Sequence, residues 1–198
     1  MRVTVAPYDP QWQTDFERVS RDLSIVLSGV DVLAVEHVGS TSVRDLPAKP
    51  IIDIDIVVRP DGLPRALAAL ELAGYVYQGE LGINDRHAFK ASDDQPRRNV
   101  YVCLDGCLAL RNHLAVRETL RSNTDLRDEY ASVKRALAEE DLGSIDDYVA
   151  GKTTVVQKIL LAAGMSAEDL DSVAAANPVG RDRETRGPAY GRLMSHDR

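Results

Sequence analysis

Hydrophobic residues follow a helical spacing in some stretches of the chain and an alternating or continuous apolar pattern in others. Apolar positions three and four apart predict helices over 10–28, 63–73, 108–122, 125–141 and 145–163. Short extended stretches bounded by turn residues predict strands over 32–38, 51–58, 75–80, 86–91 and 98–104. This order of elements is typical of an α/β (α+β) domain, in which a mixed sheet is flanked by helices and a helical lobe follows at the C-terminal end.

The helical pattern is lost near residue 165, and the last 25 residues hold few large apolar groups. A segment that buries little apolar surface cannot offset the entropy of being ordered. We therefore expect a single domain over 1–164 and a mobile C-terminal tail over 165–198.

Composition and charge narrow the class of protein. A chain of 198 residues is long enough to bury one sizeable core. Its formal net charge of −7 argues against a binder of bulk nucleic acid or of an anionic membrane surface, since both need a basic face. Two cysteines exclude a disulfide framework, and there is neither a signal-peptide pattern nor a run of ~18 apolar residues. The expected location is the cytoplasm.

Two carboxylates mark the second predicted strand. Asp53 and Asp55 lie two positions apart, so they share one face of the strand with Cα atoms ~6.5–7 Å apart, and Ile54 points to the opposite face. Neighbouring carboxylates repel each other unless a cation lies between them, and hard oxygen ligands suit Mg²⁺ or Mn²⁺. The alternative is a half-exposed strand with its polar residues in solvent.

A phosphate site is the second hypothesis, at the end of the first predicted strand. Gly39 allows a ligand to approach the backbone closely, and a short helix beginning at Ser40 or Thr41 would direct free N–H groups and hydroxyls outward. The cations that would accompany a triphosphate are Lys49, Arg86, Lys90 and, from the helical lobe, Lys152. The alternatives are a simple capped turn and ordinary surface charges. His37 fits either a phosphate contact or a buried structural role, and His113 fits a packed or capping role.

The combination of Gly39-Ser40, a spacer, and Asp53-Ile54-Asp55-Ile56 resembles the nucleotidyltransferase superfamily with the polymerase-β-like fold. Its GrpB branch is the closer match, because the stretch HVGSTSVRDLPAKPIIDIDIVV is similar to that family's signature. The resemblance covers about residues 3–160. It implies a nucleotidyltransferase-like mixed sheet, with Asp53 and Asp55 holding Mg²⁺ or Mn²⁺ and catalysing the transfer of a nucleoside monophosphate from an NTP to a small-molecule acceptor.

The sequence departs from the superfamily pattern at one position that matters for catalysis. A third carboxylate is usual on a neighbouring strand, but the stretch from Asn99 to Leu104 holds none, and the nearest acids are Asp94 and Asp105. Two further functions therefore stay open. One is a non-catalytic module that binds nucleotide or metal, and the other is an accessory protein in coenzyme A metabolism.

Overall fold

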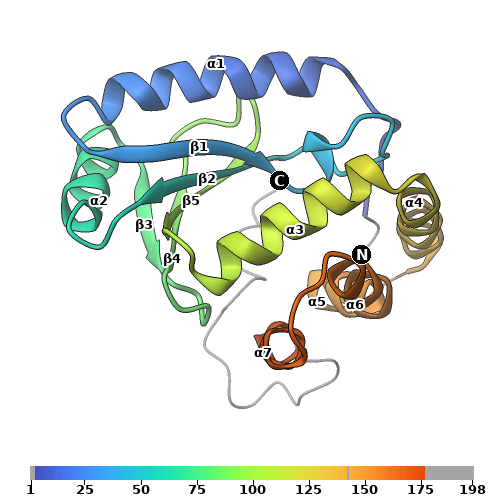
Figure 1. The fold of residues 1–198 in the computed structure, drawn as a ribbon. Coiled ribbons are helices and arrows are strands. Elements are labelled where there is room, and N and C mark those ends of the chain that lie inside the picture. Colours follow the sequence, from blue (N-terminus) through green and yellow to red (C-terminus); the bar gives the residue numbers. More distant parts are fainter. Residues whose placement is uncertain (1–2, 142, 177–198) are drawn as a thin grey trace.

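A five-stranded mixed sheet forms the centre of the protein (Figure 1). The computed structural model describes residues 3–141 and 143–176. The strand order is β1-β2-β5-β4-β3, in which β2 and β5 are parallel and the other neighbouring pairs are antiparallel. The strands are β1 (Val32–Val38), β2 (Ile52–Val58), β3 (Val76–Gly79), β4 (Arg86–Lys90) and β5 (Arg98–Leu104). The mixed α/β class predicted from the sequence is confirmed.

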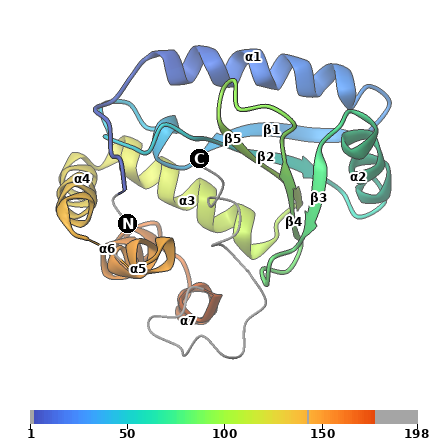
Figure 2. The same cartoon turned by 180° about the vertical axis from the view of Figure 1, so that it is seen from behind.

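Helices cover the two faces of this sheet (Figures 1 and 2). The side chains of α1 (Gln11–Val26) and α2 (Leu63–Leu72) pack with Ile52, Ile54 and Ile56 of β2 in the main core. Because side chains alternate along a strand, Asp53 and Asp55 are left on the opposite face. That face is covered by α3 (Leu108–Ser122), so the two carboxylates lie between the sheet and a helix.

The helical lobe consists of α4 (Thr124–Glu139), α5 (Ile145–Gly151) and α6 (Thr153–Ala162), which pack beside α3. The single helix predicted over 145–163 is thus two helices. A Cβ at Gly151 would lie 2.5 Å from Cδ2 of Leu137, so the close approach of α5 to α4 depends on glycine at this position. In the described part of the chain, no helix combines the length and the apolar character needed to cross a membrane.

A further helix lies within the segment expected to be a mobile tail. Helix α7 (Ala167–Ala176) packs against α3 and α6. Arg111 of α3 binds Asp169 with both guanidinium nitrogens, at 2.6 and 2.8 Å, and Val173 is buried. One buried valine and one ion pair order this helix, although its sequence is mostly small and polar. Residues 177–198 of the expected tail lie outside the described residues.

Candidate functional site

The chain turns sharply after β1, next to the first carboxylate. Gly39 has φ +69° and ψ −173°, a combination that only glycine adopts readily, and Ser40–Ser42 then form one turn of 3₁₀ helix. A Cβ on Gly39 would lie 2.2 Å from Oδ2 of Asp53. The missing side chain therefore lets the backbone of this turn lie directly against the Asp53 carboxylate.

The Gly39-Ser40 turn and Asp53 form one wall of a pocket of about 790 Å³. This volume is within the range of small-molecule sites in proteins. The other walls come from β4, β5, α3, the α5–α6 junction and α7. Their side chains include Asn99, Tyr101, Asn112, His113, Ser172 and Val173. The pocket therefore joins the sheet, the helical lobe and α7.

Asp55 is fully buried and forms an ion pair with His113 of α3. The Nδ1 atom of His113 lies 2.7 Å from Oδ2 of Asp55. Burial alone would lower the pKa of His113, but the charge of Asp55 and its hydrogen bond outweigh burial, so the pKa of His113 is raised. The second carboxylate oxygen, Oδ1 of Asp55, has no hydrogen-bond partner among the described residues. One buried acceptor atom is thus left available beside the pocket.

The carboxylate of Asp53 is hydrogen-bonded to the neighbouring strand. The Nδ2 atom of Asn99, its partner in the parallel register of β2 and β5, donates to Oδ1 of Asp53 at 2.7 Å. Burial raises the pKa of Asp53 despite this hydrogen bond. A neutral amide therefore occupies the position on β5 that lies closest to the Asp-x-Asp pair.

The carboxylates of Asp53 and Asp55 suit a magnesium ion that also binds a ligand. Among residues 3–141 and 143–176, no group of three or more His, Cys, Asp and Glu side chains is placed to hold a metal ion. Mg²⁺, however, is often bound by only one or two carboxylates together with water and substrate phosphates. Asp53, which lines the pocket, fits that kind of site, and the buried, unpartnered oxygen of Asp55 is the second carboxylate ligand on the same strand face.

Lys152 lines the lobe side of the pocket, and Lys49 and Lys134 lie close enough to Lys152 for its charge to affect them without lining the pocket themselves. The Nζ atoms of Lys152 and Lys49 lie 4.5 and 5.8 Å from the centroid of the Tyr148 ring. Burial, Lys152 and Arg97 lower the pKa of Lys49. Lys134 is almost fully buried and donates to the backbone oxygen of Pro47. Burial, followed by the charge of Lys152, lowers its pKa to about 6. An anion bound here would relieve the repulsion among these ammonium groups.

The structure brings together most of the site residues predicted from the sequence. Those that line the pocket are Gly39, Ser40, Asp53, Arg86 and Lys152. The Cζ atom of Arg86 lies 4.5 Å from the centroid of the Tyr101 ring, which places the guanidinium over a pocket-lining aromatic side chain. Asp55, Thr41, Lys49 and Lys90 are not among the lining residues. Asp55 is buried behind the pocket-lining His113, and Lys90 is exposed at the end of β4.

Thr41 and His37 are engaged inside the fold. The hydroxyl of Thr41 donates to the backbone oxygen of Ile51 at 3.2 Å and lies 3.1 Å from Nε2 of His37. The His37 ring stacks on Phe16 with centroids 4.6 Å apart, and burial together with Arg121 and Arg117 lowers its pKa to about 4. Both side chains are buried, so the structure favours the structural role of His37 and a core role for Thr41.

His113 was interpreted from the sequence as a packed or capping residue, yet it lines the pocket. The signal lies in its spacing. Ala109, Val116 and Leu120 stand four before, three after and seven after it, so His113 lies on the inward face of α3. An ionisable side chain on such a face, opposite an Asp-x-Asp strand, is a candidate partner for a carboxylate.

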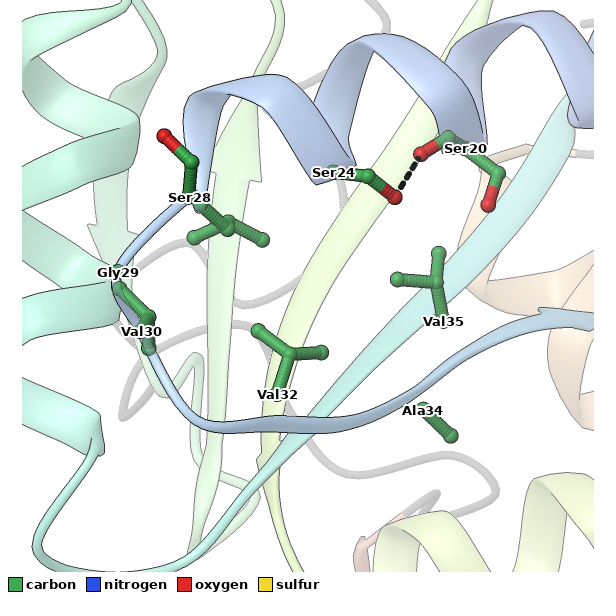
Figure 3. A pocket seen from close by; sticks show the side chains of 9 residues that line it. Ser20, Ser24, Ser28, Gly29, Val30, Val32, Ala34 and Val35 are labelled. Atoms are coloured by element: carbon green, nitrogen blue, oxygen red, sulfur yellow. Dashed lines mark hydrogen bonds between the residues drawn. The ribbon is translucent and has the colours of Figure 1, made fainter.

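A second pocket of about 460 Å³ lies between the end of α1 and β1 (Figure 3). Figure 3 shows Ser20, Ser24 and Ser28 above a floor of Val30, Val32 and Val35. None of its lining residues titrates near neutral pH, and the hydroxyl of Ser24 donates to the backbone oxygen of Ser20. This pocket therefore has no group for acid–base or metal chemistry.

Fold and site together define a mixed α/β domain in which a Gly-Ser turn lies against an Asp-x-Asp strand. More specifically, the chain belongs to the GrpB family, because the family model described as GrpB protein matches residues 2–161. A UPF0157 protein of Halalkalibacterium halodurans is 38% identical over 160 residues, which cover 80% of each protein. The crystal structure of the conserved protein GrpB from Enterococcus faecalis has a TM-score of 0.71 and 33% identity, covering 81% of this chain and 96% of that one.

Two other relatives are longer than this chain. The UPF0157 protein YqkA of Bacillus subtilis is 32% identical over 152 residues, which cover 76% of this chain but 44% of YqkA. A dephospho-CoA kinase of Mycolicibacterium paratuberculosis is 28% identical, and the match covers 76% of this chain and 43% of the kinase. The chain thus matches less than half the length of each of these two relatives.

Proposed function

We propose that this GrpB domain binds an NTP with Mg²⁺ or Mn²⁺ in the large pocket and transfers the nucleoside monophosphate to a small-molecule acceptor. The observation that carries the proposal is the contact between the Gly39-Ser40 turn and Asp53. It places backbone able to bind phosphate beside a carboxylate able to bind metal, and a metal–polyphosphate complex needs both.

The lysines support a polyphosphate as the ligand. Lys152 lines the pocket, and Lys49 and Lys134 both carry pKa values lowered by burial and by the charge of Lys152. A ligand with several negative charges would return the buried ammonium groups to their charged form. The acidic net charge of the whole chain, −7, favours a small acceptor over bulk nucleic acid.

In the proposed reaction, an acceptor oxygen forms a bond to the α-phosphorus while the bond from that phosphorus to pyrophosphate breaks, and the proton of the acceptor passes to solvent. Asp53 and Oδ1 of Asp55 would hold the divalent ion, which neutralises phosphate charge when it is bound. The Gly39-Ser40 turn and Lys152 would hold the phosphates. The ion pair with His113 would fix the orientation of the Asp55 carboxylate.

Binding is tested by calorimetric titration of ATP, GTP, CTP and UTP, each with and without Mg²⁺ or Mn²⁺. Replacement of Lys152 by glutamine removes one charge-assisted hydrogen bond, worth roughly 1.5–3 kcal/mol, so the affinity should fall about 10- to 100-fold. Lys158→Gln is the matched control, because Lys158 is an exposed lysine of α6 that does not line the pocket. Equal affinities of the two variants, or no binding of any NTP, would refute the proposed nucleotide site.

Transfer is tested with NTP labelled at the α-phosphate and a panel of acceptors. The panel includes dephospho-coenzyme A, since one relative bears the name dephospho-CoA kinase. The expected result is labelled acceptor together with released pyrophosphate, both lost in Asp53→Asn. Metal-dependent binding without release of pyrophosphate would instead identify a nucleotide-binding module. The neutral Asn99 on β5 is the feature that favours this second function.

A further inference from the structure

The two cysteines of the chain lie together where β5 passes into α3. Cys103 is near the end of β5 and has no exposed surface, whereas Cys107 is half-buried and directly precedes α3. A tight turn connects them, in which the backbone N–H of Cys107 donates to the backbone oxygen of Leu104 at 3.1 Å. Their side chains share one apolar cluster with Val57 and Leu110.

The environments of the two thiols differ. Cys107 is the N-cap residue of α3, and its side chain makes no cap hydrogen bond to the helix. The interaction with Cys103 lowers the pKa of Cys107 to about 7, against the effect of burial, and so raises the fraction of thiolate near neutral pH. The interaction with Cys107 and burial raise the pKa of Cys103. The pair therefore combines one partly accessible thiol with thiolate character and one buried, protonated thiol in the same apolar cluster.

We propose that Cys103 and Cys107 are a redox-active pair, in which a hydroperoxide oxidises Cys107 and Cys103 then closes a reversible disulfide. The inference does not depend on the proposed nucleotide chemistry. It rests on the one apolar cluster that holds both thiols, on the partial exposure of Cys107, and on its position at the start of α3. No other cysteine competes for the oxidised sulfur, since the chain holds two.

The chemistry balances in two steps. The Cys107 thiolate attacks a peroxide oxygen, so that an S–O bond forms and the O–O bond breaks. The released hydroxide or alkoxide takes up a proton, Cys107 becomes a sulfenic acid, and the peroxide is reduced. The Cys103 sulfur then attacks the Cys107 sulfur. An S–S bond forms, the S–O bond breaks, and hydroxide leaves as water with the Cys103 proton. A dithiol reductant returns both thiols.

Oxidation would act directly on the first turn of α3. Cys107 is the residue from which α3 starts, so a disulfide to Cys103 would tie the start of this helix covalently to the end of β5. The same helix carries His113, one and a half turns further on, where it pairs with Asp55. Helix α3 therefore links the redox state of Cys103 and Cys107 to the ion pair between His113 and Asp55.

The test uses the full chain, with no nucleotide present. Reduced protein is exposed to equimolar hydrogen peroxide, its remaining thiols are blocked with a maleimide, and the intact mass is measured. Untreated protein should carry two maleimide groups. Oxidised protein should carry none, weigh two hydrogens less than the unlabelled reduced chain, and yield a Cys103–Cys107 linked peptide. Dithiothreitol should restore both labels.

Serine variants, first checked by thermal melting, separate the roles of the two thiols. Cys103→Ser should stop at a sulfenic acid on Cys107 that reacts with dimedone, whereas in Cys107→Ser the buried Cys103 should resist equimolar peroxide. Retention of both maleimide labels in the wild-type chain after peroxide would overturn the proposal. So would disulfides only between molecules, or oxidation of Cys107 to a sulfinic acid with Cys103 still free.

Discussion

Replacement of Gly39 by alanine tests the contact on which the proposed site is built. The new Cβ would lie 2.2 Å from Oδ2 and 2.9 Å from Cγ of Asp53, so the turn or the carboxylate must move. Backbone strain at this φ and ψ costs about 1–3 kcal/mol, and overpacking of a filled site costs a similar amount. We expect a loss of roughly 4 kcal/mol, or about 8–16 °C in Tm for a chain of this size.

The control isolates the steric part of this loss. Gly79 has φ +76° and an added Cβ would meet nothing within 4 Å, so Gly79→Ala should cost only the backbone strain, about 1–2 kcal/mol. Thermal melts and denaturant titrations of the nucleotide-free protein give both values. Gly39→Ala should also abolish binding of Mg–NTP under the proposed function, whereas Gly79→Ala should not.

A double variant decides whether Asp53 is the cause. Asp53→Ala removes both atoms closest to the new Cβ and leaves only its own Cβ, which lies 3.0 Å away. In that background Gly39→Ala should cost about as much as the Gly79 control, so the two substitutions should be coupled by roughly 2 kcal/mol. Strict additivity, or equal losses for Gly39→Ala and Gly79→Ala, would refute the close approach as the reason for glycine.

Three further perturbations test the electrostatics and α7. Asp53→Asn should leave Tm of the nucleotide-free protein unchanged or raise it at neutral pH. Burial raises the pKa of Asp53, so its charged form lowers the stability of the fold as pH rises. A large loss of Tm in calorimetric melts would contradict this. NMR titration should give His113 a pKa above its ordinary value of about 6.5, and Asp55→Asn should lower it. The His113–Asp55 ion pair therefore stabilises the fold fully below about pH 6.5, and less as pH rises through the higher pKa of His113 in the folded state. If Asp55→Asn leaves the pKa of His113 unchanged, the ion pair is not the cause of the raised pKa. Asp169→Ala removes an exposed pair with Arg111, so Tm should change little while limited proteolysis of α7 becomes faster; an unchanged cleavage rate would mean that the pair does not hold the helix.

The sheet was predictable because its pattern is local. Alternation in β2 placed Asp53 and Asp55 opposite Ile54, and the structure has this arrangement. The close approach of Gly151, the last residue of α5, to Leu137 was not predictable, because the two residues belong to different helices. Helix α7 was missed because its sequence buries little apolar surface and depends on a contact with α3.

In the candidate site, too, contacts between residues distant in the sequence could not be predicted. The sequence placed Gly39 and Asp53 in one site by their resemblance to a known motif, and the structure brings them into contact. The partnership of His113 with Asp55 joins residues 58 positions apart, so no local pattern reports it. Threonine is a common helix-capping residue, yet the hydroxyl of Thr41 donates to the backbone oxygen of Ile51. Only the folded chain reveals this contact.

Two walls of the pocket belong to different parts of the fold. Gly39 and Asp53 belong to the central sheet, and a change there disturbs the core of the fold. Ser172 and Val173 belong to α7, which follows the last residue matched by the family model and packs on the outside of α3 and α6. Substitutions in α7 can therefore reshape one side of the cavity and leave the side formed by Gly39 and Asp53 intact. Under the proposed function, ligand preference could thus be altered from α7 at little risk to folding.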